Sequence, residues 1–232
     1  MKLFKKILQK VKSVWHRAIA RFGTKEQRSM GVAGVSCIGN IVLAFGKIAL
    51  GLLSLNFYVC VNGLYTLGMV LAKLCVLAGF IKQKKYAEQY GYCYVSGIIL
   101  VIASIAYITY SIRLLLHPQA ASYNEIVGIT IAAVTFFELG LNLHGVLAER
   151  NNKSPLFFVL KMINLSSAII CLTLTQTALL SFQQTEANHS VWNGVMGILM
   201  GSFAAMLGLM IIRKIQRMKK EECINGTYIS CR

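Results

Sequence analysis

The residue best suited to chemistry in this chain is Glu138, a carboxylate that lies deep inside an apolar segment. The chain contains no Asp, and every other Glu lies at or outside the end of an apolar segment. An ionisable side chain is costly to bury in a membrane, so Glu138 marks a candidate pathway for an ion or a proton. Any mechanism that needs two buried carboxylates is excluded.

Two lysines are candidate partners for this carboxylate. Counted from the basic ends of their segments, Glu138 lies about nine residues deep and Lys73 about eight, which is the same level at 1.5 Å per residue. Lys161 is a few residues shallower. We therefore predict an ion pair of Glu138 with Lys73 or Lys161. Three interpretations stay open: a pair that only holds the bundle, a proton or cation relay through Glu138, and a protonated Glu138 beside a lysine that extends to the interface.

Polar residues at helical spacing mark one face of four apolar segments. In the first, second, fourth and fifth segments these faces carry, in turn, Ser36, Asn40, Lys47 and Ser54; Asn62, Tyr65, Thr66, Met69 and Lys73; Thr135, Glu138 and Asn142; and Lys161, Asn164, Cys171 and Thr175. Because residues at these spacings share a helix face, we expect the four helices to surround a polar seam, with the third and sixth helices peripheral. The candidate substrate-pathway residues are Asn40, Asn62, Tyr65, Lys73, Glu138, Asn142, Lys161 and Asn164.

The elements that position these residues are six long apolar segments. Their approximate bounds are Met30–Leu53, Phe57–Ile81, Gly91–Leu116, Ile126–Leu147, Leu156–Leu180 and Val191–Ile212. A hydrocarbon core of about 30 Å is crossed by about 20 helical residues, and each segment is long enough. The sequence therefore predicts an all-α integral membrane protein, a six-helix bundle with helices one, two, four and five inside.

The basic residues lie in alternate gaps between the segments. The chain has a formal charge of +16, and twenty of its 24 Lys and Arg lie before the first segment, in the gaps after the second and fourth, and after the sixth. By the positive-inside rule this places both termini in the cytoplasm of a multi-pass protein, and we expect the plasma membrane. Anionic inner-leaflet lipid headgroups explain this charge, so nucleic acid is not the expected partner.

The chain divides into three parts. Residues 1–28 form a basic segment with apolar residues at helical spacing, which predicts an amphipathic helix on the inner leaflet. A leader that only fixes topology and a regulatory partner site are the alternatives for this segment. Residues 29–213 form the transmembrane domain, and residues 214–232 form a basic cytoplasmic tail.

The sixth segment contains two glycines at the spacing that favours close helix packing. Gly197 and Gly201 are separated by three residues, with Gly194 and Gly208 nearby. Small residues at this spacing let two helix backbones approach closely. We expect this contact inside the bundle in preference to a seam between two copies.

The first two segments resemble a known transporter family. The stretch from Gly39-Asn40 through Lys47 to Gly51-Leu-Leu-Ser54 resembles the first helix of cation diffusion facilitator (cation efflux) transporters, which shows a GN, a Lys and a GLLSGS-like turn. The stretch Val61–Met69 is similar to the ADxxHSxxD pattern of that family's second helix. The resemblance implies the six-helix fold with cytoplasmic termini and a homodimer.

The metal ligands of that family are not matched here. The ligand positions of helix two hold Asn62, Tyr65 and Met69, and residues 159–167 of helix five contain neither His nor Asp. An amide, a phenol and a thioether are poor ligands for Zn²⁺ or Mn²⁺, so we expect no metal site and no cofactor. We also expect this chain to lack the cytoplasmic metal-binding domain that is usual in the family.

Two functions remain after these exclusions. The first is a divergent cation-efflux-like transporter that moves a cation or small solute along the polar seam. The second is a non-transporting relative that serves as a membrane scaffold or interaction subunit. An enzyme is not expected, because the sequence shows no Ser–His pairing, no paired carboxylates and no HExxH motif.

Overall fold

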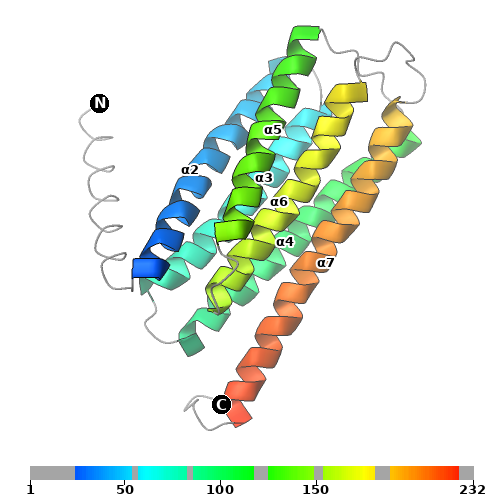
Figure 1. The fold of residues 1–232 in the computed structure, drawn as a ribbon. Coiled ribbons are helices and arrows are strands. Elements are labelled where there is room, and N and C mark those ends of the chain that lie inside the picture. Colours follow the sequence, from blue (N-terminus) through cyan, green and yellow to red (C-terminus); the bar gives the residue numbers. More distant parts are fainter. Residues whose placement is uncertain are drawn as a thin grey trace.

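Six α-helices make up the part of the chain that the computed structural model describes, residues 24–53, 57–82, 86–117, 125–148, 154–180 and 189–224 (Figure 1). The helices are α2 Thr24–Leu53, α3 Phe57–Lys82, α4 Tyr86–Leu116, α5 Glu125–Ala148, α6 Pro155–Leu180 and α7 His189–Ile224. All six are long and apolar enough to cross a membrane. The predicted all-helical, six-pass membrane bundle is confirmed. Most of the predicted surface helix 1–28 lies outside the described residues.

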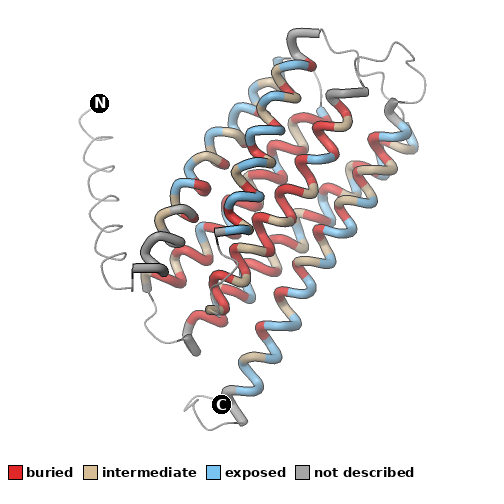
Figure 2. The backbone as a smooth tube through the Cα atoms, viewed as in Figure 1, coloured by how far each residue is buried: buried red, intermediate tan, exposed pale blue. Residues whose placement is uncertain are grey.

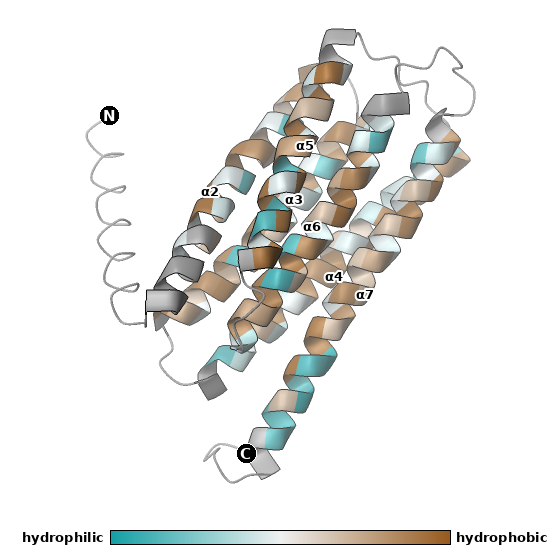
Figure 3. Ribbon diagram, in the orientation of Figure 1, coloured by the Kyte–Doolittle hydropathy of each residue, from teal (hydrophilic) through white to brown (hydrophobic). Residues whose placement is uncertain are grey.

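Successive helices run in opposite directions, so their ends gather at two ends of the bundle. One end holds the first residues of α2 and the last residues of α7, and we call it the basic end because Arg213, Lys214 and Arg217 lie there (Figure 1). α7 continues as a helix through the predicted tail boundary at residue 214 and ends at Ile224. Its last turns are mostly exposed and hydrophilic (Figures 2 and 3).

Two helices occupy the centre of the bundle. In the most apolar windows of α3 and α6, 56% and 72% of the residues are buried, whereas the other four helices have 28% to 33% buried. α2 packs against α3 and α5 on one side, and α4 packs against α3, α6 and α7 on the other. By burial, α2 and α5 are as peripheral as α4 and α7. The predicted division into four inner and two peripheral helices therefore stays a prediction.

Glycines of α7 let it pack closely on α4. A Cβ added at Gly201 would lie 2.7 Å from Cγ1 of Ile108, and one at Gly208 would lie 2.7 Å from Cγ2 of Val101. Gly197 similarly faces Ser111. The predicted packing contact inside the bundle is confirmed, since all three glycines face α4 of the same chain.

Large apolar side chains cover the outward faces of the bundle. Among the most exposed are Val35, Phe45, Leu53, Phe137 and Leu116. In a lipid bilayer these apolar faces contact acyl chains. Acyl chains offer polar side chains no hydrogen-bond partner, so the polar side chains turn inward and bond within the bundle. The buried polar residues are therefore the candidates for a functional site.

Candidate functional site

The centre of the candidate site is an ion pair between α2 and α5. Oε2 of Glu138 pairs with Nζ of Lys47, and the two residues are 0% and 1% exposed. Glu138 lies near the midpoint of the span Gly128–Leu147. Breaking a buried pair of this kind by removing one partner typically destabilises a protein by about 3–5 kcal/mol.

Residue depth, counted along the sequence from the basic ends of the segments, did not predict Lys47 as the partner of Glu138. That count favoured Lys73 or Lys161 and was wrong because it compared backbone depths alone and so passed over Lys47, whose Cα lies deeper than that of Glu138. Each Cα–Cβ bond tilts toward the amino end of its helix. α2 begins at the basic end and α5 begins at the other, so Lys47 reaches toward the basic end and Glu138 reaches away from it. The ends of the two side chains therefore meet, although the Cα atoms of Lys47 and Glu138 lie at different depths in the bundle.

Two residues of α3 complete a first cluster, the Lys47 cluster, which consists of Lys47, Asn62, Thr66 and Glu138. Nζ of Lys47 donates to Oδ1 of Asn62 at 2.7 Å and to Oγ1 of Thr66 at 3.4 Å. Oγ1 of Thr66 lies 3.5 Å from Oε1 of Glu138 and 3.0 Å from its own helix carbonyl at Asn62. All four side chains are buried.

A glycine brings α3 close enough to α2 for these bonds. A Cβ at Gly63 would lie 2.8 Å from Cγ1 of Ile48 and 3.1 Å from the carbonyl oxygen of Ala44. The backbones of the two helices therefore approach closely beside Asn62.

A second cluster, the Lys73 cluster, consists of Lys73, Ser36, Asn40, Asn142 and Ser167. Nζ of Lys73 donates to Oγ of Ser36 at 3.3 Å and to Oδ1 of Asn142 at 3.4 Å. With its amide turned so that both polar atoms are satisfied, Asn40 accepts from Nζ of Lys73 at 2.7 Å and donates to the carbonyl of Ser36 at 3.2 Å. Nδ2 of Asn142 donates to Oγ of Ser167 at 3.0 Å, which extends the cluster to α6.

The two clusters lie one after the other along the same helix faces. Asn40 and Lys47 are seven residues apart on α2, Thr66 and Lys73 are seven apart on α3, and Glu138 precedes Asn142 by four on α5. Seven helical residues advance about 10 Å along the axis. The two clusters together form a polar seam along the bundle, and hydrophilic turns interrupt apolar ones in α5 and α6 (Figure 3).

Three predicted site residues lie outside both clusters. The hydroxyl of Tyr65 lies 2.8 Å from Oγ of Ser166, so it bonds α3 to α6. Asn164 is buried, and its amide contacts Gly145 so closely that a Cβ there would clash. Lys161 is only half-buried, and no contact described for its side chain joins it to either cluster.

Sequence reasoning missed a contribution from α4. Tyr107 is 1% exposed, its hydroxyl lies 2.9 Å from that of Tyr58, and its ring lies 5.5 Å from the ring of Tyr65. The third segment shows only a weak polar stripe. A tyrosine in such a segment resembles an apolar core residue, because most of its surface is a ring.

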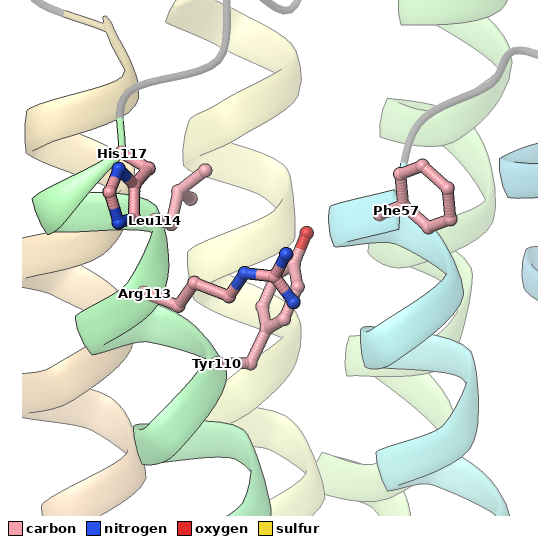
Figure 4. A pocket seen from close by; sticks show the side chains of 5 residues that line it. All are labelled: Phe57, Tyr110, Arg113, Leu114 and His117. Atoms are coloured by element: carbon pink, nitrogen blue, oxygen red, sulfur yellow. The ribbon is translucent and has the colours of Figure 1, made fainter.

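A cavity of about 200 Å³ lies at the end of the bundle opposite the basic end. Tyr110, Arg113, Leu114 and His117 of α4 line it, with Phe57 of α3 across from them (Figure 4). It shares no residue with the two clusters.

The charges and the ligand atoms of the buried side chains determine which ions the polar seam could bind. Among the described residues, the buried charged side chains are Lys47, Lys73 and Glu138. The described part of the chain contains no group of three or more His, Cys, Asp or Glu that could hold a metal ion. A tetrahedral zinc site is therefore not formed by these residues.

No known family model matches the chain, and no curated protein matches it.

Proposed function

We propose that this protein is a membrane transporter that moves a cation or a small solute along the polar seam between α2, α3, α5 and α6. The observation that carries this proposal is the Lys47–Glu138 ion pair, which is fully buried near the middle of the spans. The resemblance of the first two helices to cation efflux transporters supports the same function.

A purely structural role gives little reason for charges at this position. An apolar contact of similar volume typically stabilises a protein as well as a buried ion pair, or better by about 1–4 kcal/mol. In a membrane, buried ionisable groups typically mark ion or substrate pathways. The presence of Glu138, the one acidic residue deep in a span, therefore favours a carboxylate that changes its partner during a transport cycle.

The two clusters suggest how such a change spreads through the bundle. α5 carries both Glu138, which pairs with α2, and Asn142, which bonds α3 to α6. A proton or cation that takes the place of Lys47 at Glu138 would loosen α2 from α5 while Asn142 keeps α5 on α6. The α2 side of the seam would then open first.

The charge of the two ends supports an orientation for transport. The exposed basic residues of α7 are Arg213, Lys214, Arg217, Lys219 and Lys220. We propose that they face the cytoplasm and anionic lipid headgroups, as the positive-inside rule predicts, in a plasma membrane. The homodimer implied by the family resemblance stays a prediction.

A membrane scaffold is the second candidate. Each polar group of the Lys73 cluster already has partners within the bundle, as the bonds of Asn142 to both Lys73 and Ser167 illustrate. Such an internally satisfied network is what a purely structural seam requires.

Flux into liposomes separates the two candidates. The purified protein is reconstituted, and uptake of Na⁺, K⁺ or protons is followed with ion-sensitive dyes for the wild type, Glu138→Gln and the matched control Glu221→Gln. Glu221 is an exposed carboxylate paired with Arg217 outside the seam. The transporter proposal predicts flux for the wild type and Glu221→Gln and none for Glu138→Gln. Absence of flux in all three favours the scaffold.

A further inference from the structure

The Lys47 ammonium lies in a small site made of oxygen atoms from α3 and α5, the two helices that pack against α2. It contacts Oε2 of Glu138 on α5, and Oδ1 of Asn62 and Oγ1 of Thr66 on α3 at 2.7 and 3.4 Å. A carboxylate, an amide carbonyl and a hydroxyl are hard oxygen donors, which suit hard cations. A cation already fills this site, and that cation is tethered to α2.

We propose that these three oxygens form a binding site for a monovalent metal cation, and that the Lys47 ammonium occupies it in place of that cation. When Lys47 releases its proton to water and withdraws as the neutral amine, an alkali cation takes its place at Glu138, Asn62 and Thr66, so the net charge of the seam is unchanged. This inference names the substrate class of the proposed transporter and so rests on that function, although binding can be measured without transport.

Charge balance favours a monovalent over a divalent cation. Glu138 is the only carboxylate among the buried charged residues that the structure describes. One monovalent cation neutralises it, as Lys47 does now. A divalent cation would leave an excess positive charge in a region of low dielectric constant, with the Lys73 ammonium about two helical turns away.

The surroundings of Lys47 allow it to withdraw. Lysine carries its charge on a flexible four-carbon stem. In the most apolar window of α2, 33% of the residues are buried. This helix packs mainly against α3 and α5. A Cβ at the neighbouring Gly46 would meet nothing within 4 Å, so the face of α2 beside that of Lys47 is not packed on another helix. Because the charge lies at the end of the stem, a change of the Lys47 rotamer moves the amino group without moving the three oxygens.

The test is cation-dependent thermal stability of variants that lack the tethered charge. Lys47→Gln keeps a hydrogen-bond donor, and Lys47→Met is apolar. Both are melted as purified full-length protein in detergent with NaCl, KCl or LiCl, against choline chloride at equal ionic strength and pH. Lys47→Gln combined with Glu138→Gln is the matched control, because it has no charge to neutralise.

The proposal predicts that an alkali chloride, but not choline chloride, stabilises both single variants. A cation at about 100 times its Kd raises the Tm of a chain of this size by about 5–10 °C. The double variant should show no such difference, and the wild type a smaller one, because Lys47 competes for the oxygens.

Equal melting of both single variants in alkali and choline salts overturns the proposal. Failure of both to fold in every salt overturns it too, because the cation should replace the lost charge. Stabilisation that persists in the double variant places the cation elsewhere and overturns it as well. Absence of flux in liposomes, by contrast, rejects the transporter function and leaves cation binding to be judged by these melting curves.

Discussion

Replacement of Lys47 by Leu tests the ion pair most simply. The variant leaves the Glu138 carboxylate, which is 0% exposed, without its ammonium, and it removes the donor that Asn62 and Thr66 accept from. Loss of one partner of a buried pair costs about 3–5 kcal/mol. At about 2–4 °C per kcal/mol for a chain of this size, we expect Tm to fall by about 6–20 °C.

The assay is thermal unfolding of the purified protein in detergent that contains choline chloride, so that no alkali cation replaces the lost charge. Lys161→Leu is the matched control, since it removes a half-buried lysine outside both clusters and should shift Tm by less than about 2 °C. Lys47→Leu combined with Glu138→Leu should regain at least half of the loss, because no charge then remains unpaired. Equal melting of Lys47→Leu and the wild type, or an equal fall for Lys161→Leu, would show that Lys47 does not stabilise the fold through a buried pair with Glu138.

Three further predictions follow from the packing and the seam. Gly201→Val should destabilise the fold by about 1–3 kcal/mol, because the new Cβ would lie 2.7 Å from Ile108. Gly140→Ala is the control and should be close to neutral, because nothing lies within 4 Å of a Cβ at that position. Melting curves of the two variants check this. Asn142→Leu should destabilise the fold by about 1–3 kcal/mol and lower Tm accordingly, because Lys73 and Ser167 of α6 each lose a buried hydrogen bond to the amide. Unchanged melting would contradict this. Tyr65→Phe removes a hydroxyl bond of 2.8 Å to α6 and should cost about 0.5–1.5 kcal/mol in the same assay; a stabilised variant would contradict it.

The polar seam was predictable because helical periodicity is visible in sequence. Residues at spacings of four and seven place Asn40, Asn62 and Glu138 on inward faces, and the structure buries all three. The same periodicity identified Lys47 as part of the polar face of the first helix, although not as the partner of Glu138. Burial of polar groups follows from the lipid, which offers them no partner.

The pairing within the seam was not predictable in the same way. It depends on the register between helices and on the direction in which each long side chain extends, and neither is encoded in spacing along one helix. Lys161 illustrates the limit, since it lies on a predicted polar face but is only half-buried. Tyr107 illustrates the converse, because its hydroxyl is buried although the polar stripe of the third segment is weak.

The most direct test of the account is transport by Lys47→Leu/Glu138→Leu in liposomes. This variant exchanges the buried ion pair for an apolar contact, so it should remain folded. We predict that it melts within about 10 °C of the wild type and yet shows no cation flux above empty liposomes, while the wild type transports. Flux equal to that of the wild type would contradict the claim that the Lys47–Glu138 pair is the moving part of a transporter.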